Sequence, residues 1–487
     1  MAKARAATKR APRRRKPVKV HFSELQNRRV RARYDVAQDT DENSRLYNGL
    51  VTTSAAQELT LAVRTKLRNR ARNEVANDPY ANGIGHTLAN HVIGRCPRVN
   101  IKPSQEGREK SAQRREREFM RWAKAVRLGQ KLRMGVLSVY RDGEIFVQKI
   151  TNDKIKHPVK LDIVLIETDR IDCAPYGRGR DDEIEGIVYD TIGNPVKYRV
   201  LDCHPGDGYA AGGFTWVPAS QMSHWYDPDR PGQLRGAPGI TPSIELFGER
   251  RRYRRATIAA AETAAENAMV LQTGAPAEGL DEVAAAMESV ELERRMATFL
   301  PAGYELSQTK AEQPTTTFND FDGRMLNEAA RSVDMPYNIA ACNSSGYNYA
   351  SGNLDHLGFW RTVCIKQYDI ECMVLDDLFE AWNKEADLIP GYLDEMDEED
   401  EHKWFFDRRV HADPVKEATA QATRIATGTS TYEEEAEMDG VDPEARWAQR
   451  AKEWKRAKEE GIPYPVPQGT TANQTQGDGD GAGETEN

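Results

Sequence analysis

Hydrophobic positions in the first third of the chain recur at the spacing of a helix. Leu59, Val63, Leu67 and Ala71 stand four residues apart and predict a helix that ends before the NDP tripeptide at 77–79. A second helix is predicted over about 82–93, ending at Gly94. A third helix follows, and its apolar residues lie among many charges: Phe119, Trp122 and Ala123.

The pattern then becomes typical of β-strands. Residues 137–150 place an Asp142-Gly143 pair between two runs rich in β-branched and aromatic residues, which predicts a hairpin. A turn is also predicted at Gly193-Asn194. The further predicted strands are 159–166, 184–189, 195–201 and 214–217. Helices followed by a meander of short strands indicate a small α+β domain.

From Thr241 the pattern is helical again, with Ser243 as the predicted N-cap and no proline before Pro276. About 28 helical residues would make a rod of roughly 40 Å. Residues 274–316 differ in composition and predict a compact excursion, after which a helix is predicted at about 319–333.

A loop without charges, NSSGYNYASG at 343–352, precedes a predicted helix of about 30 residues. Its apolar positions share one predicted face: Leu354, Leu357, Cys364, Tyr368, Leu375, Leu378 and Trp382. Two more helices are predicted at 414–427 and 443–458, separated by TSTYEEE at 429–435.

Charge is distributed very unevenly along a chain whose net charge is −8. Between Lys3 and Arg33 there are thirteen Lys or Arg and one acid, Glu24. Residues 394–401 (DEMDEEDE) are almost purely acidic, and the last twenty residues are rich in Gly, Thr, Asn and Asp. Both chain ends are therefore expected to be mobile arms.

Two basic clusters are candidate polyanion contacts. The first lies in the N-terminal arm, which could bind nucleic acid or an acidic protein: Arg13, Arg14, Arg15 and Lys16. The second opens the long helix, where an ion-paired helix surface against a neighbouring subunit is the alternative to a nucleic-acid contact: Arg250, Arg251 and Arg252.

The chain carries no recognisable catalytic motif. It has no Walker-type phosphate loop, no nucleophile elbow, no zincin motif and no dinucleotide fingerprint. The Asp181-Asp182 and Asp376-Asp377 pairs are expected to be solvated, and His86 and His91 are five residues apart, which is poor spacing for joint metal ligation. The sequence therefore predicts no catalytic residue, no metal and no cofactor.

Compartment signals are equally sparse. The six cysteines show no C-x-x-C spacing and are expected to be reduced and mostly buried. No membrane span is predicted, and the basic N-terminus lacks the apolar stretch of a secretory signal, although it shares the composition of a mitochondrial presequence.

Seven stretches, in order, resemble the lambda-like family of tailed-phage portal proteins. They are NDPYANGI with NHVIG (77–84, 90–94), RDGEIFV (141–147), IETDRI (166–171), HWYDP with QLRGAP (224–228, 233–238), NSSGYNYASG (343–352), the helix after it, and TSTYEEE (429–435). No single stretch is diagnostic, and their order carries the resemblance, which covers about 78–461.

The resemblance implies an α+β portal fold with a mixed wing, a long helical stem, a small clip, a tunnel helix and an α-helical crown. The implied map is: 1–48 basic flexible arm, 49–240 wing, 241–273 first stem helix, 274–316 clip, 317–342 second stem helix, 343–352 tunnel loop, 353–409 tunnel helix and wing return, 410–465 crown, and 466–487 disordered tail.

The resemblance also implies a non-enzymatic ring, usually of twelve copies, at one capsid vertex of the virion, assembled in the host cytoplasm. Its implied partners are double-stranded DNA, the terminase large subunit, a head–tail adaptor, and the major capsid and scaffold proteins. The implied DNA-facing residues of the tunnel loop are Asn343, Ser344, Ser345, Gly346, Tyr347, Asn348 and Tyr349. The alternatives are a nucleic-acid-processing enzyme of the packaging machinery and a basic-armed capsid or scaffold protein.

Overall fold

The computed structural model describes residues 45, 52–171, 183–207, 213–265, 269–273, 304–308, 315–397, 399–407 and 413–463, with the backbone alone for those from 263 to 317. The chain divides into two compact units, 1–54 and 55–487, and nearly all described residues belong to the second. The predicted arm with Arg13–Lys16, most of the predicted clip, the Asp181-Asp182 pair and the tail lie outside the described residues.

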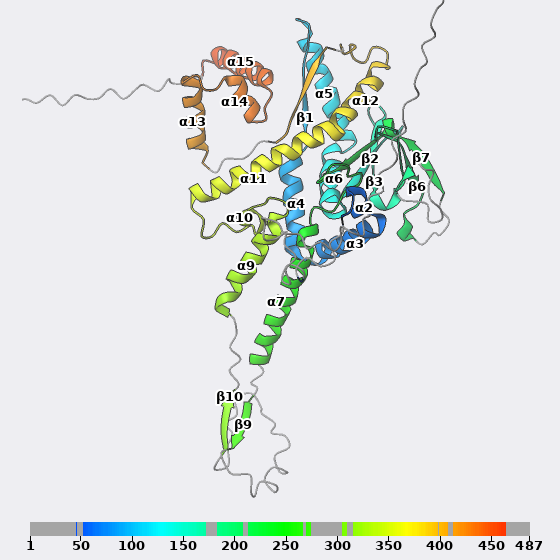
Figure 1. The fold of residues 1–487 in the computed structure, drawn as a ribbon. Coiled ribbons are helices and arrows are strands. Elements are labelled where there is room, and N and C mark those ends of the chain that lie inside the picture. Colours follow the sequence, from blue (N-terminus) through cyan, green and yellow to red (C-terminus); the bar gives the residue numbers. More distant parts are fainter. Residues whose placement is uncertain are drawn as a thin grey trace, which may run out of the picture. The chain divides into compact units, whose positions relative to one another are not determined.

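The first helices follow the prediction in their bounds but not in the face they bury. After α2 (Ala55–Glu58), α3 spans Leu61–Asn77 and α4 spans Pro79–Ile93 (Figure 1). Asp78 caps α4 by accepting from the amides of Tyr80 and Ala81. In α3 the predicted apolar face is wrong, because Val63 is 39% exposed. Of the four predicted positions only Ala71 is buried, and the other buried residues of α3 are Arg64, Arg68 and Glu74.

The predicted hairpin around Asp142-Gly143 is also wrong. Residues 128–142 form helix α6 (Leu128–Asp142), which comes after α5 (Glu109–Ala125), and only the second half of the predicted hairpin is a strand. Gly143, at φ 97°, ends the helix as a left-handed C-cap. The buried Leu128, Leu132, Val136 and Val139 stand three or four residues apart, a helical period that outweighs the turn signal.

Three small antiparallel sheets hold the described strands apart from β9 and β10. In the first, β2 (Glu144–Thr151) pairs with β3 (Leu161–Glu167) and β8 (Met222–Tyr226). In the second, the order is β4 (Glu183–Ile184), β5 (Ile187–Tyr189), β6 (Pro195–Leu201) and β7 (Phe214–Pro218). The third joins β1 (Arg98–Lys102) to β11 (Glu401–Phe405), a pairing that the local pattern did not predict.

The predicted strand at 184–189 is two strands. Ile184 pairs with Ile187, and the two residues between them, Glu185 and Gly186, have φ values of 49° and 84°. Positive φ at both central residues is the signature of a type I′ hairpin turn. The short helical turns of the fold are η3 (Thr168–Arg170), η4 (Pro205–Asp207), η5 (Ala219–Gln221), η6 (Thr241–Ser243) and α10 (Tyr337–Ala340).

Two long helices come after the sheets. Helix α7 spans Ile244–Ala265 and α9 spans Thr315–Arg331, and the Tyr253 ring stacks on Phe318 with 5.5 Å between centroids. The hydroxyl of Ser243, the predicted N-cap that directly precedes α7, donates to the Ala329 carbonyl at 2.8 Å. Residues 269–273, predicted to be helical, form strand β9 (Met269–Thr273), which pairs with β10 (Tyr304–Gln308).

The predicted 30-residue helix is interrupted once. It consists of α11 (Tyr349–Ile370), a π-helical turn η7 (Glu371–Leu375) and α12 (Asp376–Asp387). Leu354 and Tyr368 are 69% and 64% exposed, whereas Leu375 and Trp382 are completely buried, so the expectation of one common face is wrong. The i→i+5 bonding of the π-turn rotates α12 relative to an unbroken continuation of α11.

At the C-terminal end, α13 (Pro414–Ala426), α14 (Tyr432–Met438) and α15 (Pro443–Glu460) form a group of three helices. The sequence predicted the outer two helices with a non-helical separator at 429–435. Instead, Thr431 and Glu434 form a capping box there that starts α14.

The main hydrophobic core is centred on aromatic rings from distant parts of the chain. Phe119 lies 5.2 Å from Phe379 and 5.3 Å from Trp382 between ring centroids, both edge-on. A smaller core between the two larger sheets contains Phe146, Ile187 and Tyr198.

Two expectations about the chain surface can also be compared with the structure. No helix among the described residues has the length and apolarity needed to cross a membrane. The expectation that the cysteines are mostly buried is wrong for the described ones, because Cys203, Cys342, Cys364 and Cys372 are exposed thiols. Cys96 is half-buried, and burial raises its pKa to about 11.

Candidate functional site

The buried carboxylate of Glu144, at the start of β2, accepts hydrogen bonds from several side chains. Glu144 is 1% exposed, and Arg235 donates to both of its oxygens at 2.6 to 3.0 Å. His224 Nε2 lies 2.9 Å from Oε2, and Arg64 Nη1 lies 3.2 Å from Oε1. The Thr168 hydroxyl also donates to Oε1. We call these five side chains the Glu144 centre.

The charges of the Glu144 centre favour an ionised carboxylate. Burial alone would raise the pKa of Glu144, but Arg235 and His224 hold it well below its usual value. Burial lowers the pKa of His224, so this ring is neutral and donates its Nε2 hydrogen. Burial lowers the pKa of Arg64, with Arg235 as the next cause, and Glu185 supplies that guanidinium with a second carboxylate.

Three of the seven stretches that carry the family resemblance meet at this centre. Glu144 comes from RDGEIFV, Thr168 from IETDRI, His224 from HWYDP and Arg235 from QLRGAP. The backbones of Gly143 and Gly236 touch, since a Cβ on Gly236 would lie 2.0 Å from the Gly143 carbonyl oxygen. The two glycines are therefore required by close backbone approach.

Arginines of α3 extend this network. Arg68 and Arg72 each donate to one oxygen of Asp169 at 2.7 Å, and Arg72 also donates to Asp142 at 2.6 Å. Burial would raise the pKa of Asp169, but these two guanidinium groups lower it. The polar face of α3 is thus the buried one because its partners come from η3, α6 and β2.

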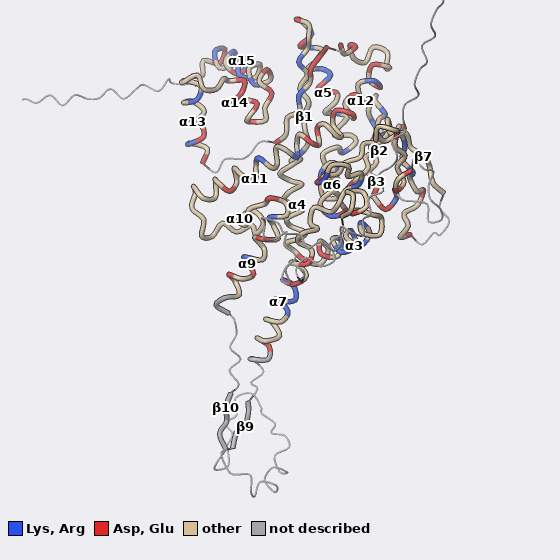
Figure 2. Tube along the Cα trace, in the orientation of Figure 1, with Lys and Arg blue, Asp and Glu red and all other residues tan. Residues whose placement is uncertain are grey.

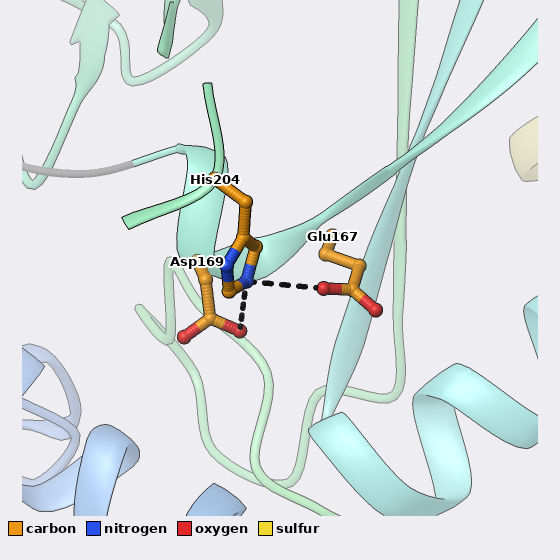
Figure 3. Close-up of side chains that lie close together, drawn as sticks. All are labelled: Glu167, Asp169 and His204. Carbon is orange, nitrogen blue, oxygen red and sulfur yellow. Dashed lines mark ion pairs between the residues drawn. The ribbon is translucent and has the colours of Figure 1, made fainter. Parts of the chain in front are cut away.

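One group of carboxylates and a histidine in the described part of the chain has metal-ligand geometry. Glu167, Asp169 and His204 bring one ligand atom each within 4.8 Å of one another (Figure 3). Both Asp169 oxygens already accept from arginines, and His204 Nδ1 accepts from the Gly206 amide at 2.9 Å. Neutral His204 therefore carries its hydrogen on Nε2, 3.2 Å from Glu167, where a metal would need a bare nitrogen. We therefore interpret the group as part of the ion-pair network that joins Asp169 to Arg68 and Arg72, with neutral His204 beside it.

The predicted basic cluster on the long helix is partly buried. Arg250 is 1% exposed, pairs with Asp322 at 2.7 Å and Asp78 at 3.5 Å, and lies 4.4 Å from the centre of the Tyr80 ring. Arg251 pairs with Glu74 at 2.8 Å, whereas Arg252 is exposed. For Arg250 and Arg251 these contacts favour the ion-pair interpretation, with partners in the same chain.

The predicted tunnel loop is exposed and locally ordered. Six of its residues, Asn343, Ser344, Ser345, Gly346, Asn348 and Tyr349, are exposed, and Tyr347 is half-buried. Asn343 Oδ1 accepts from the Ser345 amide at 2.9 Å, and Asn348 forms a capping box with Ser351 that starts α11. Gly346, at φ 86°, makes the turn.

A lysine side chain lies next to this loop, which the sequence did not predict. Lys416 of α13 lies with its Nζ 4.6 Å from the centre of the Tyr349 ring. The two residues are far apart in sequence, so no local signal could have paired them. The loop itself remains uncharged.

The remaining candidate polar residues serve the fold. Asp376 accepts from the Trp404 indole at 2.8 Å, and Asp377 accepts from the Ser223 hydroxyl at 2.7 Å, while both side chains stay partly exposed to solvent, as expected, at 43% and 42%. His91 Nδ1 lies 2.8 Å from the Thr87 carbonyl, an ordinary helical hydrogen bond, and His86 is exposed.

Comparison with known proteins gives a consistent result. The family model for phage portal proteins of the lambda family matches residues 43–367. A probable portal protein of Halomonas phage phiHAP-1 is 26% identical over 439 residues, which are 84% of this chain and 83% of the relative.

Two solved structures have lower similarity. A chain from the virion of a native gene transfer agent particle is 13% identical at a TM-score of 0.45, covering 78% of this chain and 94% of the other. One from the neck of an empty particle is 12% identical at a TM-score of 0.44, with the same coverage.

Proposed function

Because the chain belongs to the lambda family of phage portal proteins, as the match over residues 43–367 shows, we propose that its copies close into a ring at one vertex of the capsid. Twelve is the expected number of copies. The ring would be the channel for DNA during packaging and ejection. It would be assembled in the host cytoplasm among the major capsid and scaffold proteins.

Unsatisfied apolar surface supports association between copies. Leu354, Leu357, Ile365 and Tyr368 of α11 are each at least 50% exposed. Several large exposed apolar side chains on one helix are typical of a surface that another chain covers. A ring requires two different, complementary surfaces on each copy, related by a rotation that closes.

We assign the five functional regions to the observed elements. The wing would comprise the elements up to β8, and α7 and α9 would be the stem helices. The region between β9 and β10 would be the clip, which would bind the terminase large subunit and later the head–tail adaptor. Helix α11 would be the tunnel helix, and α13 to α15 the crown.

The loop from Asn343 to Tyr349 is the part that would face DNA. Lysine or arginine contacts would hold phosphates in deep energy wells, because each such contact releases condensed counterions. Exposed serine, asparagine and tyrosine side chains offer only weak contacts, so the duplex could slide past. Twelve chains of net charge −8 would add about −96 formal charges, which disfavours adhesion to the ring.

The uncharged exposed loop is the observation that carries the channel proposal, and lysines placed in it provide the test. The double variant S344K/S345K should form rings but package DNA at a rate reduced about tenfold or more, measured as nuclease-protected DNA over time. The control T191K/V196K adds the same charge at two exposed positions, one in the turn before β6 and one at the start of β6, and should package normally. Normal packaging by S344K/S345K rings would refute a DNA-facing loop.

A further inference from the structure

The three C-terminal helices bury very little of their own surface. Neither α13, with 13 residues, nor α15, with 18 residues, contains a buried residue. Around Tyr432, Ala436 and Trp447 the helices leave a cavity of about 220 Å³. Isolated helices of this length are marginal in water, and most helical stability in proteins comes from packing of one face. The group is therefore incomplete as a folded unit in one copy.

One largely exposed face of α15 has a defined chemistry, and its first turn also borders the cavity, where the Trp447 ring lies 5.5 Å from that of Tyr432 of the same copy. Trp447, Arg450, Trp454 and Lys458 stand three or four residues apart and so share one face. The two tryptophans are 48% and 53% exposed. Arg450 lies 5.5 Å from the Trp447 ring centre, and Lys458 lies 5.3 Å from that of Trp454. We call these four residues the α15 stripe.

The adjacent helix has the opposite charge. Helix α14 carries four glutamates in seven residues (Figure 2). Of these, Glu433 and Glu434 are exposed, as is Met438 at 63%. Within one copy, Arg446 of α15 forms an ion pair with Asp439, the C-cap of α14, at 3.2 Å. Among the described residues, Arg450 and Lys458 of the stripe form no salt bridge.

We infer that the α15 stripe of one copy packs against the acidic face of α14, Glu433, Glu434 and Met438, of the next copy. This inference rests on the proposed ring. A basic aromatic surface and an acidic surface with an exposed methionine are complementary, and their position on different helices gives the head-to-tail contact that a ring requires. Each copy would use both surfaces, so every contact around the ring would be the same.

A second copy fits this surface better than duplex DNA does. Residues 413–463 contain twelve acidic and eight basic residues, so phosphates near the stripe would also meet carboxylates. Tryptophan rings bind nucleic acid chiefly by stacking on unstacked bases, which a duplex does not offer. A protein surface covers indole rings and satisfies their neighbouring cations together.

Cross-linking between copies tests the inference. Differently tagged full-length chains carrying M438C and A451C are co-assembled and treated with a short bis-maleimide, and the mixed dimer is measured on a gel. Chains with the native cysteines alone give the background. We expect a mixed dimer well above that background.

Charge reversal then identifies the surfaces. R450E/K458E in the A451C chain should reduce the mixed dimer about tenfold or more, because like charges then face each other, and E433K in the M438C chain should restore part of it. The matched reversal K452E/R456E lies on the opposite face of α15 and should leave the yield unchanged. Circular dichroism checks that each variant keeps its helices.

Each outcome separates the possibilities. If rings form but the M438C–A451C cross-link is absent, or is unaffected by R450E/K458E, this inference is wrong while the proposed ring still stands. Loss of duplex DNA binding by R450E/K458E with an unchanged cross-link would assign the stripe to DNA and also overturn it. Absence of rings from the parent chain in electron micrographs would defeat the proposed function itself, and this inference with it.

Discussion

Replacing Glu144 by glutamine should strongly destabilise the sheets around β2. Around the carboxylate the structure places only donors: two arginines, a histidine, a threonine hydroxyl and the Gly236 amide. The glutamine side chain has the same shape, but its amide nitrogen must face a donor whichever way it turns. E144Q also leaves Arg235, which is 3% exposed, without its carboxylate.

The size of the effect can be worked out from burial. Removing one partner of a buried ion pair typically costs about 3–5 kcal/mol, because the remaining charge stays desolvated. A loss of about 3 kcal/mol corresponds to roughly 100-fold faster opening of the surrounding structure. Removing both charges in E144Q/R235M should recover part of this loss, since no unpaired guanidinium then remains between the sheets.

Hydrogen exchange of the β2 amides, followed by mass spectrometry, measures the opening directly. The control E167Q is the same substitution at a side chain that is 49% exposed at the end of β3, and it should change exchange by less than about threefold. If the β2 amides exchanged no faster in E144Q than in E167Q, the Glu144 centre would not stabilise the sheets around β2.

Acid should mimic this substitution. The folded-state pKa of Glu144 lies well below that of the unfolded chain, so its stabilisation is present above the ordinary glutamate pKa of 4.5 and is lost as pH falls through the lower folded value. As the pH falls from 4.5 towards that lower folded value, the wild-type β2 amides should therefore lose protection progressively and approach the exchange rates of E144Q. Unchanged protection down to the folded pKa would contradict the assigned charge state.

Three further predictions concern other positions of the fold. G236A should lower the free energy of unfolding in urea by more than about 2 kcal/mol, because its Cβ would overlap the Gly143 carbonyl. G248A adds a Cβ in open space on α7 and should raise the free energy of unfolding by about 0.5–1 kcal/mol. Equal effects of the two variants would exclude the close approach of Gly143 and Gly236. R250M should lower the free energy of unfolding in urea by about 3 kcal/mol, because Asp78 and Asp322 then lose their buried guanidinium partner. The exposed R252M should change the free energy of unfolding by less than about 0.5 kcal/mol. Burial, and to a smaller extent Asp442, raises the pKa of Glu116 to about 7, so this group destabilises the fold progressively as pH rises from about 4.5 to 7. E116Q should therefore be more stable than wild type by about 1–2 kcal/mol near pH 8 and equally stable near pH 4. A difference in urea midpoint that stays the same at both pH values would contradict this.

Much of the local structure is determined by the sequence alone. Helix α4 is fixed by signals within a few residues of it: the Asp78 side chain at its start, the apolar period inside it and Gly94 at its end. The strands at 195–201 and 161–167 result from β-branched residues bounded by turns. The exposure of the uncharged 343–349 loop is also expected from its composition.

The tertiary structure decided which charges are buried. Helix α3 buries Arg64 and Arg68 because each pairs with a carboxylate, Glu144 or Asp169. These partners lie 80 and 101 residues further along the chain. Helical periodicity assumes that the apolar face is the buried one, and it has no means of detecting such distant partners. The choice of strand β11 as the partner of β1, about 300 residues away, is equally invisible to local pattern.

The same limit applies to the long helix and the hairpin that was not formed. The π-turn at Glu371–Leu375 is needed only because the core lies on different sides of α11 and α12, which is a property of the packed molecule. Asp142-Gly143 is a turn signal in isolation, but packing of Leu132 and Val136 makes the residues before it helical. The sequence by itself therefore determined where most elements begin and end, and only long-range packing decided which face of each is buried, because burial depends on partners that no local window contains.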